Sequence, residues 1–533
     1  MSPETHRGSA AASKGREKVI NIGMLLPAHA RYQPRAVGLK VRGIEYSFAE
    51  LDARVNQLAN ALLAAGLVKG DKVSTIMTNR LEFVLMYWAA AKTGIVIVPV
   101  STLLQDAGLK VLLADSDTTM VIADTAFAET LDRIRPDQPG VAPDRYILVG
   151  VGAGGVPRGF RSFEALVAGA PTTAPPDAGL VGDDVYNIMY SSGTTGLPKG
   201  IVHTQYVRAQ YCTLFASAFR MTPESVLLHT GSMVFNGAMI DMMPWMFLGC
   251  RYILHEAFDP PRMIEEIEAS RVTHIVLVPS QVMALLNHPH FEPRKLASLE
   301  MLLSVGAPLL MEYKNRIHQA LPGRYYELYG LTEGFMTILD KRDARVKNGS
   351  VGIPVRLLEM KIVDAQRNEL AAGEIGEICG RGPLLMPGYY NRPELTSETI
   401  IDGWLHSGDA GYVDEDGFLY LVDRLKDMII SGGVNVYPKD IEEVVVAHPA
   451  VAEVAVFGVP HAKWGEVPVA AVTLMPGAST RPVDLRAWTN ARVAAKFQRV
   501  ADLFVMSEFP RNVAGKTLKR EIRADYLELQ ESS

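Results

Sequence analysis

Residues 190 to 200 read YSSGTTGLPKG and follow a run of buried-type residues, Val185 to Met189. The stretch combines three glycines and four serine or threonine hydroxyls with one lysine, Lys199. Glycines let backbone N–H groups approach an oligophosphate, hydroxyls donate further hydrogen bonds, and a lysine supplies positive charge. The stretch is not a Walker A loop, because Lys199 is followed by Gly200 rather than by serine or threonine. It predicts a phosphate-binding loop after a strand; the plainer alternative is a flexible turn.

Short β-branched runs alternate with amphipathic helices on both sides of this loop. Residues 47 to 66 show the helical pattern, since Ser47 and Glu50 form a capping box and Gly66 ends the apolar face. A strand over Val73 to Met77 follows, and the same alternation recurs further along the chain. The pattern predicts an α/β fold with mixed, largely parallel sheets that are flanked by helices.

The chain has 533 residues, too many for one ordinary core, so more than one domain is expected. A break near DRLKD, residues 423 to 427, separates a smaller α+β pattern. This pattern comprises helix Lys439 to Ala447, strands Val451 to Phe457 and Val469 to Leu474, helix Asp484 to Lys496 and strand Leu503 to Met506. The predicted division is a disordered leader at 1–18, a large domain at 19–423, a hinge at 424–426 and a small mobile domain at 427–533.

Composition excludes several classes of protein. The 53 basic and 59 acidic residues give a net charge of -6 without a basic block, so nucleic acid is not an expected partner. Cys212, Cys250 and Cys379 fit neither a disulfide framework nor a zinc spacing, which favours a cytoplasmic location. Residues 81 to 100 are apolar but interrupted by charges and a glycine, so no membrane span is predicted. A homo-oligomer is left open.

The loop at 190 to 200 resembles the phosphate loop of the adenylate-forming superfamily. This superfamily includes acyl-CoA synthetases, aryl-CoA ligases, peptide-synthetase adenylation domains and beetle luciferases. Four further segments match in the expected order: ELYGLTEG at 327–334, WLHSGD at 404–409 with Arg424, RLKDMIISGG at 424–433, and NVAGKTLKR at 512–520. The resemblance implies an AMP-forming carboxylic acid:CoA ligase. Such an enzyme uses ATP and Mg²⁺ to form an acyl-adenylate, and then transfers the acyl group to CoA.

The resemblance also assigns roles in nucleotide binding. Tyr329 would stack on adenine, Thr332 would bind the α-phosphate, and Glu333 would hold Mg²⁺, a hard cation that prefers oxygen ligands. Asp409 and Arg424 would bind the ribose hydroxyls. The complete ATP and AMP site implied by the resemblance is Ser191, Ser192, Gly193, Thr194, Thr195, Gly196, Lys199, Gly306, Ala307, Pro308, Glu327, Leu328, Tyr329, Gly330, Thr332, Asp409, Leu421 and Arg424.

Lys516 matches the lysine that the family uses for adenylation. Attack of a carboxylate on a phosphate brings two anions together, and a cation must offset their charge. The resemblance therefore implies a catalytic set of Lys516, Thr332, Glu333 and Lys199. It places Lys426 at the hinge between two poses of the small domain. It also places a passage for CoA at Gly432, Gly433 and Trp464, although a hairpin turn at the two glycines is the alternative.

Residues 232 to 240, SMVFNGAMI, align with a family segment that carries an aromatic gate, which is Phe235 here. The predicted acyl pocket is Val234, Phe235, Asn236, Gly237, Met239, Val305, Leu328, Gly330, Phe335 and Met336. Apolar residues are core residues by default, so this assignment has a plain alternative. Since no basic residue is evident in the slot, the expected substrate is an apolar acid, either aliphatic of medium length or aryl. His229, nearby, is interpreted as a packed histidine.

Other functions remain open at this point. A stand-alone adenylation enzyme would load a carrier protein, but no carrier segment follows Lys516, so CoA is the simpler acceptor. A luciferase-like oxidase would share every motif and differ only in its pocket. A non-catalytic nucleotide-binding module would tolerate the loss of Lys516 and Glu333, and both residues are present.

Overall fold

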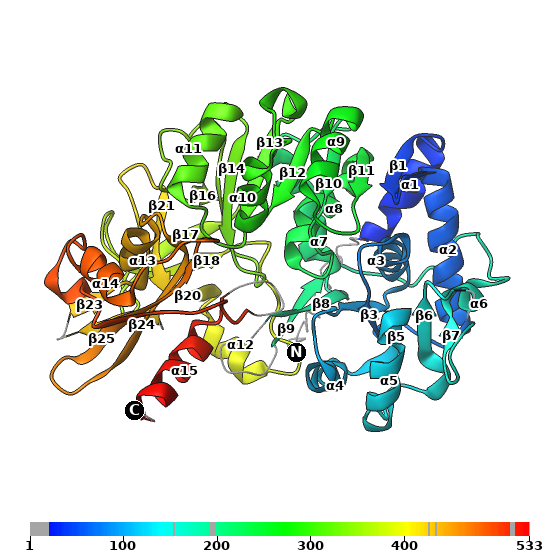
Figure 1. Ribbon diagram of the computed structural model, residues 1–533. Helices are drawn as coiled ribbons and strands as arrows, with labels where there is room; N and C mark the ends of the chain where they lie inside the picture. Colours follow the sequence, from blue (N-terminus) through cyan, green and yellow to red (C-terminus); the bar gives the residue numbers. More distant parts are fainter. Residues whose placement is uncertain are drawn as a thin grey trace, which may run out of the picture.

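A computed structural model describes residues 21–152, 155–191, 199–424, 427–431, 434–511 and 517–531. These residues form four β-sheets with flanking helices (Figure 1). The first part of the chain, blue to green in Figure 1, builds two large sheets, and the orange and red part builds the small C-terminal sheet. The expected large domain of mixed sheets followed by a smaller α+β domain is confirmed.

One large sheet holds the strand that leads into the glycine-rich loop. Its seven strands lie in the order β7 (Arg161–Ser162), β6 (Tyr146–Val149), β5 (Thr118–Asp124), β3 (Lys72–Ile76), β4 (Val96–Pro99), β8 (Val185–Ser191) and β9 (Lys199–Thr204). All neighbours are parallel except β8 and β9, which pair antiparallel with Ser191 opposite Lys199. Residues 192–198 connect these two strands and lie outside the described residues.

The other large sheet has nine strands. Their order is β16 (Ile353–Pro354), β15 (Met336–Leu339), β14 (Tyr325–Gly330), β13 (Met301–Val305), β12 (His274–Leu277), β10 (Val226–His229), β11 (Arg251–Leu254), β1 (Val37–Val41) and β2 (Ile44–Ser47). The central strands are parallel and both edges are antiparallel. Parallel strands need covering on both faces, which explains the buried runs in β10 to β14.

Helices between the two sheets join them into one core. The capping box of Ser47 and Glu50 is confirmed at the start of α2 (Phe48–Ala64). Together with α3 (Leu81–Thr93), α7 (Gln205–Ala218) and α8 (Met239–Leu248), this helix contributes to one apolar cluster that also includes strands of both sheets. The remaining helices of the large domain are α1 (Leu25–Tyr32), α4 (Asp106–Asp115), α5 (Ala128–Ile134), α6 (Phe163–Val167), α9 (Pro260–Ser270), α10 (Pro279–Asn287), α11 (Met311–Ala320) and α12 (Pro393–Thr399).

The third and fourth sheets complete the described chain. The third is antiparallel and comprises β17 (Glu359–Val363), β18 (Gly376–Arg381), β19 (Ile400–Ile401), β20 (Trp404–Val413) and β21 (Leu419–Arg424). The fourth comprises β22 (Ile429–Ser431), β23 (Val434–Val436), β24 (Val451–His461), β25 (Gly465–Leu474) and β26 (Asp502–Val505), with helices α13 (Pro438–Val446), α14 (Pro482–Asn490) and α15 (Lys519–Glu531).

The expected helix over Asp484 to Lys496 is too long. Helix α14 ends at Asn490, whose side-chain amide donates to the carbonyl oxygen of Val500 and accepts from the backbone N–H of Val500. These bonds turn the chain towards β26 and end the helix. No helix among the described residues is both long and apolar enough to cross a membrane. Cys212, Cys250 and Cys379 are buried free thiols.

Candidate active site

Three residues predicted to bind nucleotide meet at Asp409 on β20. The Tyr329 hydroxyl on β14 donates to Asp409 Oδ2 at 2.8 Å, and Arg424 Nε on β21 lies 3.1 Å from Asp409 Oδ1. Asp409 and Arg424 are opposite each other in the antiparallel ladder, so their pairing follows from strand register. Asp409 is only 8% exposed. Burial, together with the Asp409 charge, holds the pKa of Tyr329 well above its usual range, so this phenol is a donor.

A glycine turn holds Asp409 in place. Gly408 has a φ of +70°, a left-handed conformation that favours glycine, and it lies where the pairing of β18 with β20 shifts register. The Gly408 N–H donates to Glu377 Oε1 at 3.0 Å, while Glu377 Oε2 lies 2.7 Å from His406 Nδ1. The Cys379 sulfur also contacts His406 Nδ1, at 3.4 Å. Among the described residues, these three side chains form the group compact enough to share a metal ion, but their bonds already serve the Asp409 turn.

The carboxylate predicted to hold Mg²⁺ has a partner that sequence reasoning missed. The Tyr389 hydroxyl donates to Glu333 Oε1 at 2.8 Å, and Lys199 Nζ lies 5.3 Å from the centroid of the same ring. Tyr389 thus contacts two of the four predicted catalytic residues, Glu333 and Lys199. Glu333 is half-buried and offers carboxylate oxygens, a donor set that suits a hard cation such as Mg²⁺.

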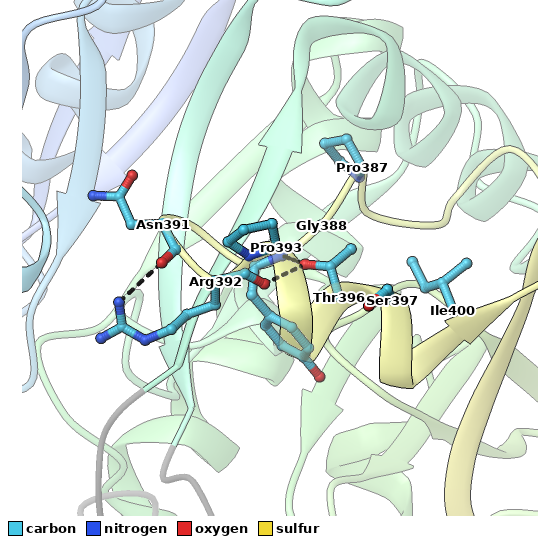
Figure 2. Close-up of a pocket in the computed structure, with 9 residues that line it drawn as sticks. Pro387, Gly388, Asn391, Arg392, Pro393, Thr396, Ser397 and Ile400 are labelled. Atoms are coloured by element: carbon cyan, nitrogen blue, oxygen red, sulfur yellow. Dashed lines mark hydrogen bonds between the residues drawn. The ribbon is translucent and has the colours of Figure 1, made fainter.

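The backbone that carries Tyr389 is fixed by α12. Thr396 Oγ1 accepts from the Tyr389 N–H at 2.9 Å and donates to the Arg392 carbonyl at 2.8 Å. Arg392 and Thr396 are among the residues that line a surface pocket of about 490 Å³. Figure 2 shows these side chains. Arg392 pairs with Asp115, which also accepts from the hydroxyl of Tyr190, the first residue of the glycine-rich stretch. The segment from Gly388 to Ile400 therefore contacts Glu333 directly and, through Asp115, Tyr190 of β8.

Thr332 is held through its backbone by a buried histidine. His203 Nε2 lies 2.9 Å from the Thr332 carbonyl oxygen. Asn187 Oδ1 accepts from Arg208 Nε at 2.9 Å, so the Asn187 amide nitrogen donates to His203 Nδ1 at 3.3 Å. The proton of His203 is therefore on Nε2, and this nitrogen donates to Thr332. Burial, with help from the Arg208 charge, holds the pKa of His203 well below its usual range, so the ring is neutral.

The residues predicted to line the acyl slot divide into two groups. Phe235, Asn236, Gly237, Val305 and Gly330 are partly or fully exposed, whereas Val234, Met239, Leu328, Phe335 and Met336 are buried. The ring of Phe335 occupies the space that a side chain at Gly380 would need, since an added Cβ there would lie 2.0 Å from the ring. The side chain of Phe335 thus packs within the core.

Other predicted nucleotide residues have clear positions. Gly306, Ala307 and Pro308 are exposed at the carboxyl end of β13, and Gly306 has a φ of +97°. Glu327 on β14 is 3% exposed, and its carboxylate accepts from Lys314 Nζ and, at 3.1 Å, from the Tyr325 hydroxyl. The Glu327 side chain is therefore engaged inside the protein. Its contact with a nucleotide stays a prediction.

The structure does not describe every predicted residue of the loop, the hinge and the small domain. Ser192, Gly193, Thr194, Thr195, Gly196, Lys426, Gly432, Gly433 and Lys516 lie outside the described residues, as does the predicted leader. Strands β22 and β23 pair antiparallel on either side of the two glycines, with Ser431 opposite Val434. Trp464 is 47% exposed at the turn between β24 and β25. Lys439 links α13 to β21, because its Nζ donates to the Leu421 carbonyl at 2.9 Å.

Three comparisons place this geometry among known proteins. The family model for AMP-binding enzymes matches residues 26–390, and that for the AMP-binding enzyme C-terminal domain matches residues 440–516. A feruloyl-CoA synthase from an Amycolatopsis species is 34% identical over 500 residues, which cover 93% of this chain and 96% of the relative. A long-chain-fatty-acid–CoA ligase from Mycobacterium tuberculosis is 33% identical over 512 residues, which cover 95% and 98%.

A solved structure extends the likeness to three dimensions. ATP-bound MatB from Rhodopseudomonas palustris superimposes with a TM-score of 0.85 at 29% sequence identity. The match covers 95% of this chain and 99% of that protein. Both sequence and architecture are therefore shared over nearly the whole length.

Proposed function

The chain belongs to the AMP-binding enzyme family and is an ATP-dependent, AMP-forming acid–CoA ligase, and we propose that its substrate is an apolar carboxylic acid, aliphatic of medium length or aryl. The enzyme converts acid and ATP to acyl-adenylate and pyrophosphate, and then acyl-adenylate and CoA to thioester and AMP. Two steps are needed because a carboxylate is a poor electrophile whose leaving group would be oxide, whereas AMP leaves readily.

The proposal of an apolar acid is supported by Asn236, the polar side chain of the predicted slot, which forms hydrogen bonds with other side chains of the protein. Asn236 Oδ1 accepts from Arg208 at 2.9 Å, and Asn236 Nδ2 donates to the Tyr211 hydroxyl at 3.0 Å. Both ends of the amide are thus occupied by groups of the protein. The remaining predicted lining is apolar or glycine, apart from backbone groups. An apolar acyl group loses no hydrogen bond there.

We assign the nucleotide to the large domain. Asp409 with Arg424 would take the ribose hydroxyls, and Thr332 would contact the α-phosphate. Glu333 would hold Mg²⁺, which supplies positive charge to the phosphates when bound, and Lys199 would add a second cation. Support comes from the convergence of Tyr329, Asp409 and Arg424 and from the shared contacts of Tyr389. These roles are proposals from the resemblance.

We assign the second half of the site to the small domain. Lys516 would offset the charge between the carboxylate and the α-phosphate during adenylation. Rotation at Lys426 would then bring Gly432 and Gly433 to the thioester-forming pose, where CoA passes. A cytoplasmic location is proposed because all three cysteines are free thiols.

The test is a panel of carboxylic acids assayed for pyrophosphate, AMP and thioester with and without CoA. We expect pyrophosphate release with apolar acids, and thioester only when CoA is present. Absence of pyrophosphate with every acid would reject the proposed adenylation. Acyl-adenylate formation without any transfer to CoA would instead favour a carrier-protein acceptor.

A further inference from the structure

Three side chains of different metal-binding chemistry meet where strands β18 and β20 pair. Glu377 and Cys379 lie two residues apart on β18, and His406 lies opposite Cys379 on β20. His406 Nδ1 is 2.7 Å from Glu377 Oε2 and 3.4 Å from the Cys379 sulfur. One ligand atom of each side chain lies within 4.8 Å of the other two. Strand pairing thus gathers a carboxylate, a thiol and an imidazole into one Glu–Cys–His group.

The facing atoms of this group are all potential ligands for a cation. Carboxylate oxygen, imidazole nitrogen and cysteine sulfur are the atoms that bind Zn²⁺ in proteins. His406 Nδ1 faces both the carboxylate and the sulfur, but a ring nitrogen carries at most one proton. That proton serves the shorter contact, the one to Glu377. A cation between the three atoms would instead accept a lone pair from each of them.

The separations within the group suit a tetrahedral ion. Zinc-to-sulfur bonds of about 2.3 Å and zinc-to-nitrogen or zinc-to-oxygen bonds of about 2.0–2.2 Å place sulfur and nitrogen about 3.6 Å apart, and nitrogen and oxygen about 3.4 Å apart. The Cys379 sulfur and His406 Nδ1 are already 3.4 Å apart. Only Glu377 Oε2, at 2.7 Å from Nδ1, must draw back, by about 0.7 Å. Rotation of the Glu377 side chain can supply this movement.

The group can be reached from solvent on one side. The side chains of His406 and Glu377 are 12% and 22% exposed, whereas Cys379 is buried. An entering cation would therefore meet the imidazole and the carboxylate first and the sulfur last. Three protein ligands leave a fourth tetrahedral position for water.

The second oxygen of Glu377 connects the group to the proposed ribose site. Glu377 Oε1 accepts from the Gly408 N–H at 3.0 Å, and Gly408 directly precedes Asp409. Asp409 in turn contacts Arg424 and Tyr329. When Oε2 is drawn to a metal ion, Oε1 of the same rigid carboxylate moves with it. The bond to Gly408 and the position of Asp409 therefore depend on whether the group holds an ion.

We propose that Glu377, Cys379 and His406 bind Zn²⁺, and that the bound ion weakens ATP binding by displacing the turn that carries Asp409. The thiol releases its proton to solvent when the sulfur binds the metal. Sulfur and nitrogen ligands favour Zn²⁺ over Mg²⁺, so the Mg²⁺ used in the ligase reaction does not compete for this site. The effect on ATP rests on the proposed function, whereas binding of the ion does not.

The first experiment detects the ion at the cysteine. Metal-free, full-length protein is titrated with Co²⁺, which occupies zinc sites and gives a thiolate-to-cobalt charge-transfer absorption in the near ultraviolet. We expect this absorption to saturate at one Co²⁺ per chain and to disappear when Zn²⁺ is added. Cys379→Ala should lose it. Cys250→Ala, which alters another buried free thiol, is the matched control and should keep it.

The second experiment measures the effect on ATP. Initial rates of acid-dependent pyrophosphate release are recorded at varied ATP and saturating Mg²⁺, with and without Zn²⁺. Zinc should raise the KM for ATP by about tenfold, the loss expected for weakened hydrogen bonds to a charged group. A chelator selective for zinc over magnesium should restore the KM. Cys379→Ala and His406→Gln, each compared with its own zinc-free rate, should not respond, whereas Cys250→Ala should respond as the wild type does.

Two results would overturn the site: a wild type without the charge-transfer absorption, or an equal absorption in Cys379→Ala. Zinc that binds at the group without changing the KM for ATP would overturn its link to Asp409. An equal rise of the KM in the wild type, Cys379→Ala and His406→Gln would place the zinc effect at the nucleotide instead. If Cys379→Ala does not fold, the cobalt affinity of His406→Gln, which should fall, decides. Failure of the wild type to release pyrophosphate with any acid would reject the proposed function but not the cobalt result.

Discussion

The ribose side and the phosphate side of the proposed site are held in different ways. On the ribose side, Asp409 is anchored directly by the cation Arg424 and the phenol of Tyr329. On the phosphate side, Thr332 and Glu333 are held by neutral groups, the imidazole of His203 and the phenol of Tyr389. We infer from this difference that the charged side chains on the phosphate side are available to bind ligands.

The largest effects are expected on the phosphate side. Lys199→Ala removes a cation that would face the phosphates, and Glu333→Ala removes the proposed Mg²⁺ ligand. Each should lower the rate of pyrophosphate release on the order of 10² to 10³, as is usual for one electrostatic partner of a transition state. Rates near that of the wild type in both variants would mean that the phosphates bind elsewhere.

A smaller effect is expected on the ribose side. Asp409→Asn keeps the shape but loses the charge that faces Arg424, so hydrogen bonds to the ribose hydroxyls weaken. The KM for ATP should rise about 10- to 100-fold, the range for bonds to a charged group, with a lesser change in kcat. Initial-rate kinetics at varied ATP concentration measure both values. A fall in kcat alone would contradict a binding role.

Tyr389→Phe tests the neutral brace of Glu333. The ring that faces Lys199 is kept, and only the hydroxyl that donates to Glu333 Oε1 is lost. The Mg²⁺ concentration needed for half-maximal rate should change by about 3- to 10-fold, the range for one neutral hydrogen bond. Tyr412→Phe, which alters a half-buried tyrosine of β20 stacked on Tyr420, serves as control. If the Mg²⁺ requirement of Tyr389→Phe equals that of the wild type, the Tyr389 hydroxyl has only a structural role.

The smallest effect concerns the neutral brace of Thr332. The pKa of His203 lies well below 6.5 in the folded protein, so the unfolded chain binds the extra proton first as pH falls. The stability that depends on neutral His203 is complete above about pH 6.5 and is lost below it, with a slope of up to about 1.4 kcal/mol per pH unit. His203→Gln should show a shallower slope in chemical denaturation between pH 5 and 6.5. An identical slope would mean that His203 is protonated when folded.

The fold could be predicted where local signals and burial agree. Ser47, Glu50 and Gly66 set the ends of one helix through hydrogen bonds and backbone conformation that are encoded within a few residues. The helix predicted to reach Lys496 is wrong, because the bonds of Asn490 to Val500 depend on tertiary contact. The antiparallel third sheet also has no local signature, since strand direction depends on distant pairing.

The proposed site divides in the same way. Lys199, Glu333, Asp409 and Arg424 belong to motifs, so their residue types and spacing identify them. Tyr389 and His203 could not be identified, because an aromatic or basic residue in an apolar run reads as core until its partners are known. The roles of all these residues remain predictions. The structure adds the contacts through which each can be tested.

The most direct test of the proposed two-domain mechanism measures the two half-reactions separately in the Lys516→Ala variant. If Lys516 serves only adenylation, this variant should lose pyrophosphate release from acid and ATP. It should still convert supplied acyl-adenylate and CoA to thioester at a rate near that of the wild type. Lys496→Ala, which alters an exposed lysine of the same domain, should retain both steps. Equal loss of both steps in Lys516→Ala would contradict the account, because one lysine would then act in both poses.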